Sequence, residues 1–92
     1  MNRTELETAM EKILANEAGL LADLTARIKT KMKRAGLSTK KPVADMVEAF
    51  YNSAPGVKFF IAHAYALGED HADEFANGFI RGCNNYVRGK MN

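Results

Sequence analysis

The side chains best suited to binding chemistry lie in one stretch of the chain, between residues 27 and 41. This stretch, the basic segment, holds seven cations and no acid: Arg27, Lys29, Lys31, Lys33, Arg34, Lys40 and Lys41. Clustered cations attract phosphate groups, anionic lipid or an acidic protein surface, and they speed encounter in a salt-dependent way. We therefore predict that the basic segment binds a partner that carries phosphates or carboxylates.

The charge of the chain is polarised, although its formal net charge is only +2. The basic segment contributes +7, whereas residues 1–26 carry a net charge of −3 and residues 42–92 a net charge of −2. A polarised surface of this kind indicates a role in association rather than a particular fold.

Residue types that carry catalysis or hold metals are scarce and poorly spaced. Cys83 falls on the apolar arc of the last predicted helix, where a thiol is usually buried and inert. His63 lies in the most apolar stretch, where a lone histidine is more often a core residue than a ligand. The acids around His71 lack EF-hand or paired-histidine spacing. We predict a non-enzymatic protein with no cofactor and no metal site.

Cysteine usage and hydropathy point to one compartment. The single cysteine excludes an internal disulfide, which fits a reducing environment. The first residues are charged and lack an apolar signal core, and the longest apolar run is far shorter than the about 20 residues that cross a bilayer. We predict a cytoplasmic protein with no membrane span.

Apolar residues at helical spacing predict one long first helix over residues 5–34. They are Leu6, Met10, Ile13, Leu20, Leu24, Ile28 and Met32. Such a helix would be about 45 Å long, whereas a compact chain of this size is roughly 30 Å across. We favour a kink or break between Asn16 and Gly19, because both residue types weaken a helix. The alternative is a continuous helix that pairs with a second copy in a homodimer.

Local signals mark the ends of the predicted elements. Thr4 and Glu7 have the spacing of a capping box at the start of the first helix. Gly36 suits a left-handed C-cap at its end. Three further helices are predicted over residues 42–52, 57–67 and 70–88. The second of these is apolar all round, which is typical of a central helix; its alternation also fits a strand, but its alanines favour a helix. The sequence thus predicts an all-α, four-helix single domain over residues 1–92.

Two glycines interrupt the last predicted helix. Gly78 and Gly82 lie four residues apart at the boundary between its apolar and polar arcs. A missing side chain at this glycine notch lets another backbone approach closely. We favour packing within the molecule as its use, and a docking notch for a partner is the alternative.

Two short segments resemble a known family. The opening residues 1–6 (MNRTEL) and the turn over residues 35–41 (AGLSTKK) are similar to the first helix and the inter-helix turn of bacterial histone-like HU proteins. The two segments are farther apart here than in that family, and no counterpart of the HU strands or DNA-embracing arm follows Asn52. No DNA-contacting residue is therefore carried over from the resemblance.

These observations predict function through binding. The leading hypothesis is a small regulatory or inhibitory protein that docks its basic helix-turn surface on a larger protein or nucleoprotein with an acidic surface. Compact inhibitors encoded by phages and plasmids, such as anti-CRISPR proteins, are a matching class. The alternatives are a protein that binds the DNA or RNA backbone without sequence preference and a helical homo-oligomer with a structural role.

Overall fold

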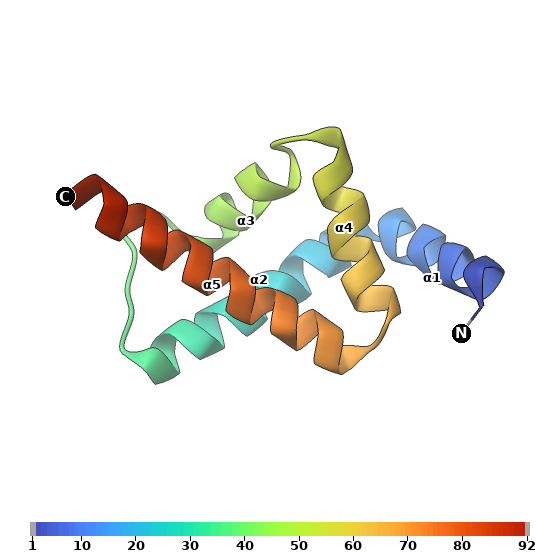
Figure 1. Ribbon diagram of the computed structural model, residues 1–92, viewed down its shortest axis with the longest axis horizontal. Coiled ribbons are helices and arrows are strands. Elements are labelled where there is room, and N and C mark those ends of the chain that lie inside the picture. The colour runs from blue at the N-terminus through green and yellow to red at the C-terminus, as the bar shows by residue number, and fades with distance from the viewer. Residues whose placement is uncertain (1, 92) are drawn as a thin grey trace.

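The computed structural model describes the backbone of residues 2–91 and the side chains of residues 2–82. Five helices make up this part of the chain (Figure 1): α1 (Arg3–Ala15), α2 (Glu17–Ala35), α3 (Val43–Tyr51), α4 (Pro55–Ala66) and α5 (Glu69–Met91). The predicted all-α class is confirmed. There are five helices instead of four because the long first helix is divided in two.

The division occurs at Asn16, within the predicted break region. Its backbone N–H donates to the Ile13 carbonyl at 3.1 Å and ends α1, while its side-chain oxygen accepts from the Gly19 N–H at 3.3 Å and begins α2. A Cβ on Gly19 would lie 2.9 Å from Cγ of Asn16. The glycine therefore leaves room for the asparagine cap, and the two residues form the break together.

The cap at the start of α1 differs from the predicted one. Asn2, not Thr4, caps the helix: its Oδ1 accepts from the Glu5 N–H at 2.9 Å, and its Nδ2 donates to Oε1 of Glu5 at 2.9 Å. The predicted Thr4–Glu7 capping box is wrong because Glu7 instead pairs with Arg3, at 3.0 Å. The first turn of α1 therefore begins two residues earlier than the sequence signal suggested.

Gly36 ends α2 as predicted. Its φ of 70° lies in the left-handed region, and the Leu37 N–H donates to the Met32 carbonyl at 2.9 Å. This left-handed cap turns the chain away from the axis of α2. The connection to α3 therefore starts in a fixed direction, which matters because it carries Lys40 and Lys41.

The core is built around α2. Its side chains Leu20, Leu24 and Ile28 are buried against α3 and α5. The remaining members of the buried cluster come from the later helices: Val43, Val47, Tyr51, Ile61 and Ala76. In Figure 1, α5 crosses α2 near the middle of the molecule, and both α3 and α5 pack on α2.

The prediction that the apolar stretch 57–67 forms a central helix is wrong. It is helical, as α4, but it lies at one side of the core and packs on α1, α5 and, less extensively, α3 (Figure 1). Only Ile61, Ala62 and Ala66 are buried in α4, while Phe59 and Phe60 are 50% and 65% exposed. Because α2 already occupies the centre, α4 buries one narrow face and presents its phenylalanines outward.

The described molecule is elongated, with principal extents of 45 × 26 × 21 Å. In Figure 1, α1 extends from one end of α2 along the long axis. The break at Asn16 lets α1 pack chiefly on α4.

No helix within the described part of the chain is both long enough and apolar enough to cross a membrane. The first helix is not continuous, as the alternative of a homodimer required, and the homodimer itself stays a prediction.

Candidate docking surface

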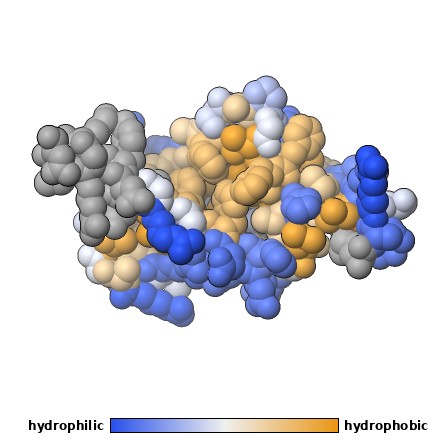
Figure 2. Space-filling model, in the orientation of Figure 1, coloured by the Kyte–Doolittle hydropathy of each residue, from blue (hydrophilic) through white to orange (hydrophobic). Residues whose placement is uncertain are grey.

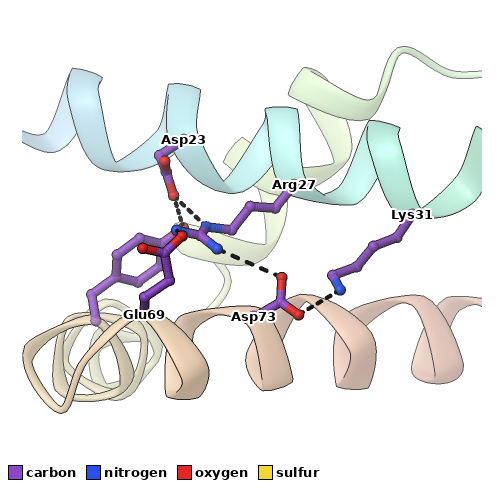
Figure 3. Close-up of polar contacts among 6 residues, drawn as sticks. Asp23, Arg27, Lys31, Glu69 and Asp73 are labelled. Carbon is purple, nitrogen blue, oxygen red and sulfur yellow. Dashed lines mark hydrogen bonds and ion pairs between the residues drawn. The ribbon is translucent and has the colours of Figure 1, made fainter.

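Two cations of the basic segment take part in an ion-pair network between α2 and α5 (Figure 3). Arg27 Nε donates to Oδ2 of Asp23 at 2.7 Å, and its Nη atoms reach Glu69 at 3.3 Å and Asp73 at 3.6 Å. Lys31 Nζ lies 2.8 Å from the other carboxylate oxygen of Asp73. These contacts hold α5 against α2.

Tyr65 extends the network to α4. Its hydroxyl donates to Oδ2 of Asp23 at 2.7 Å, and its ring centroid lies 5.8 Å from Cζ of Arg27. Burial raises the pKa of Tyr65, and the hydrogen bond to Asp23 raises it further. Burial alone would raise the pKa of Asp23, but hydrogen bonds from Arg27 and Tyr65 and the Arg27 charge outweigh it and lower that pKa. The hydrogen bond from Lys31 lowers the pKa of Asp73.

Arg27 and Lys31 therefore have a structural role that the sequence did not reveal. Their side chains are only 20% and 18% exposed, and the network partners on α5 are distant in sequence. Only Asp23, one helical turn before Arg27, could have been found from sequence spacing. Part of the predicted binding segment thus holds the fold together.

The other five cations of the basic segment are exposed and make no ion pair within the described residues: Lys29, Lys33, Arg34, Lys40 and Lys41. Three of them project from the C-terminal half of α2, and two lie on the connection to α3. Thr39 Oγ1 donates to the Lys41 carbonyl at 2.6 Å, which fixes the turn that carries the lysine pair. These five cations are called the free basic surface.

An apolar groove lies beside the free basic surface, bounded by α3, α4, α5 and the connection that follows α2. Its volume is about 1500 Å³. The apolar side chains along it are Met46, Phe50, Phe60, Leu67, Phe75 and Phe79. Figure 2 shows apolar side chains gathered over α3 and α4 on this face of the molecule. We call this feature the phenylalanine groove.

Four phenylalanine rings form a connected row in the groove. The ring of Phe50 lies 5.4 Å from that of Phe79 and 6.1 Å from that of Phe75, and Phe75 lies 5.6 Å from Phe60, between centroids. Aromatic pairs at these separations attract each other beyond the area that they bury. The row therefore gives the groove an ordered aromatic wall contributed by three helices.

The glycine notch opens into the same groove. Gly78 and Gly82 both line it, and a Cβ added at either position would meet no described atom within 4 Å. The favoured interpretation, that the notch packs against another part of the molecule, is therefore wrong for the described residues. Lys40 and Lys41 also line the groove. The structure thus brings the glycine notch and two predicted binding cations together.

The groove could not have been found from the sequence pattern. Phe50 was expected on a buried face and His63 in the core, yet His63 is exposed and both line the groove. His71 lines it as well. The described side chains include no group of three or more potential ligands positioned to hold a metal. The side chain of Cys83 lies outside the described residues.

Comparison of the chain with protein-family models, curated proteins and solved structures gives no match. The short resemblance to HU proteins therefore has no support from a family match. A proposal of function follows from the chemistry of the free basic surface and the phenylalanine groove.

Proposed function

We propose that this chain is a non-enzymatic binding protein that docks its free basic surface on a larger protein with an acidic surface. The observation that supports the proposal is the position of Lys40 and Lys41. They belong both to the free basic surface and to the lining of the phenylalanine groove. A partner that approaches the cations therefore also meets the aromatic wall, in which Phe60 is exposed and the other three rings are partly buried.

This combination matches the anatomy of protein interfaces. Their buried centres are enriched in aromatic residues and methionine, whereas charged residues lie mainly at the rim. Here Phe60 and Met46 lie in the groove and lysines lie at its edge. Burying apolar area contributes about 25 cal/mol per Å², and a nucleic-acid backbone offers little apolar surface for such burial. The groove therefore favours a protein partner over a duplex.

Regulation or inhibition would follow if the bound chain covered a functional surface of its partner. A chain of 92 residues that acts without chemistry changes its partner by blocking a surface or by holding one conformation of it. Phage- and plasmid-encoded inhibitors, including anti-CRISPR proteins, act at this size. We propose such a role for this chain.

The second candidate function is binding to the DNA or RNA backbone. Lys29, Lys33 and Arg34 favour it, because they are exposed on one helix and make no ion pair within the described part of the chain. If four or five cations faced one duplex, the slope of log affinity against log salt would be roughly −4. Sequence would matter little, because phosphate contacts carry no direct base information.

The test compares two double charge reversals of equal size. Lys33→Glu/Arg34→Glu alters the free basic surface, whereas Lys12→Glu/Arg81→Glu alters exposed cations outside it. After affinity capture from the source cell, the purified partner is titrated by calorimetry. We expect the first variant to bind at least about tenfold more weakly, a change of about 1.4 kcal/mol, and the control to bind like wild type.

Duplex binding is measured with the same proteins. We expect wild type to bind a duplex no more tightly than non-specific binders, near 10⁻⁴ to 10⁻⁶ M at about 0.15 M salt. Sub-micromolar duplex affinity that is lost in Lys33→Glu/Arg34→Glu would favour the nucleic-acid function instead. Equal partner affinity for both double variants would contradict docking through the free basic surface. Matching circular dichroism spectra confirm that both variants fold.

A further inference from the structure

We propose that the phenylalanine groove binds an acidic amphipathic helix of the protein partner. Apolar side chains of that helix would cover the phenylalanine row, and its carboxylates would face Lys40 and Lys41. This inference rests on the proposed function, which it extends from a basic surface to a defined kind of ligand.

The groove presents apolar area that the chain does not cover within its described part. Phe60 is 65% exposed and Leu67 is 42% exposed, and both line the groove. Contiguous exposed apolar surface of this kind is typical of interaction sites in soluble proteins. Phe60 also contacts Phe75, so that an apolar ligand would rest on a ring already held in position.

The size of the groove favours a segment of protein over a small molecule. Pockets for small ligands usually measure about 300–1,000 Å³, whereas this groove measures about 1500 Å³. The described backbone is helical and contains no strand, so that strand addition to a sheet edge is unavailable there. Among the other modes of peptide recognition, we propose a helix in the groove, with apolar anchors at positions i, i+3 or i+4, and i+7.

The charges around the groove favour an acidic helix. Lys40 and Lys41 line it, while Glu74 is the single acid among its described lining residues. Lys33 and Arg34 lie at the end of α2, immediately before the connection that carries the lysine pair. A helix with carboxylates along the edge of its apolar face would therefore meet the opposite charges of Lys40 and Lys41 at the groove.

A second copy of the chain is a less suitable occupant. The acids at the start of α5 that could face the lysines include Glu69 and Asp73, but these already pair with Arg27 and Lys31. The acidic face of α1 belongs to a helix that packs on α4 of its own chain. Neither helix can therefore offer an apolar face together with these acids in trans without losing contacts in its own fold.

The probe is a fluorescein-labelled synthetic helix with leucines on one face and glutamates elsewhere. A length of about 18 residues is suitable, because isolated helices below about 12–15 residues are marginal in water. A control peptide of identical composition has its leucines distributed around the helix. We expect the amphipathic probe to bind wild type at least about tenfold more tightly than the control peptide, measured by fluorescence anisotropy at low salt.

Two neighbouring phenylalanines give a matched pair of protein variants. Phe60 lines the groove and Phe59 does not, although both are at least half exposed on α4. We expect Phe60→Ser to weaken probe binding about tenfold, as expected for truncation of an interface anchor. Phe59→Ser should change it less than about twofold. If Phe60→Ser unfolds the protein, Gly78→Leu is used instead, because it places a side chain in open space within the groove.

The outcomes separate this proposal from the proposed function. If both peptides bind equally, and Phe60→Ser and Gly78→Leu have no effect, the groove proposal is overturned even when Lys33→Glu/Arg34→Glu loses the protein partner. If that double variant keeps its partner, the proposed function fails independently of the peptides. Light scattering tests the remaining outcome. If wild type is a dimer and Phe60→Ser is a monomer, a second copy of the chain occupies the groove, and the helix proposal is overturned.

Discussion

Arg27 joins three helices through one guanidinium group. It pairs with Asp23 on its own helix and with Glu69 and Asp73 on α5, and its ring contact with Tyr65 reaches α4. Hydrogen bonds that involve a charged group contribute about 1.5–3 kcal/mol, whereas exposed ion pairs contribute about 0–1 kcal/mol. With a side chain that is only 20% exposed, Arg27 lies between these two classes.

The network predicts that stability depends on pH at both extremes. Asp23 and Asp73 have pKa values below their ordinary ones in the folded state. Their stabilising contribution is therefore complete above the unfolded-state pKa of about 3.9, and it is lost as pH falls through the lower folded-state values. The pKa of Tyr65 is raised, so that its contribution is present below about pH 10 and is lost as pH rises further.

Urea unfolding of wild type and of Arg27→Ala tests this dependence. At pH 7 we expect Arg27→Ala to lower the free energy of unfolding by about 1–2 kcal/mol. Below about pH 4 the stability of wild type should fall more steeply with acid than that of the variant. The reason is that Asp23 has no guanidinium partner in the variant, so that its protonation there costs less stability. Parallel acid profiles for the two proteins would show that the network does not set the pH dependence.

At the residue scale, the sequence revealed which side chains are charged but not which of them are free. The seven cations and the absence of acids between them were visible directly. The pairing of Lys31 with Asp73 was not, because it depends on the packing of α5 against α2. Free and paired cations can be distinguished only when both helices are placed.

At the scale of elements, two glycines with different surroundings should respond in opposite ways to the same substitution. Gly36 has a φ of 70°, where a Cβ costs roughly 1–2 kcal/mol. Gly78 lies inside α5 with open space around its Cα, where alanine should stabilise the helix by about 0.5–1 kcal/mol. Thermal unfolding should therefore show a lower midpoint for Gly36→Ala and a higher one for Gly78→Ala.

The pair also separates stability from binding. Gly36→Ala disturbs the turn that leads to Lys40 and Lys41, whereas Gly78→Ala narrows the phenylalanine groove by only one methyl group. A lower midpoint for Gly78→Ala would mean that another part of the chain occupies the notch. An unchanged midpoint for Gly36→Ala would mean that the left-handed cap does not control the end of α2.

Local sequence signals predicted element boundaries well and burial less well. Gly36 and the Asn16–Gly19 break are determined by short-range backbone geometry, so that their effects could be predicted from a few residues. The position of α4 depends on competition among helices for the centre. In an all-apolar stretch, the sequence does not reveal which face of the helix becomes buried. For this reason the exposure of Phe60 and the groove itself could not be predicted.

At the scale of the whole molecule, α1 is the least firmly held helix by burial. Although all of its side chains are described, none is fully buried, whereas α2 buries three. It packs on α4 only because the chain turns at Asn16. If Asn16 also became helical, α1 and α2 would fuse into one helix of about 50 Å, and α1 would be carried away from its own α4.

A double substitution that favours helix at the break tests this dependence. Asn16→Ala/Gly19→Ala removes the cap and the residue that leaves room for it, and alanine is the strongest helix former. We expect light scattering at high protein concentration to show twice the 10.2 kDa chain mass. Thr25→Ala, on α2 away from the break, serves as the control and should keep the wild-type mass. A monomeric double variant with unchanged helix content would show that the break does not depend on these two residues.

The dimer expected from that variant would be an exchanged one, in which each α1 packs on the α4 of the other copy. The contacts between α1 and α4 would be the same as in the single chain, and only the connection at Asn16 would differ. In such a dimer, the identity of residues 16 and 19 would determine whether α1 packs on its own chain or on the other copy.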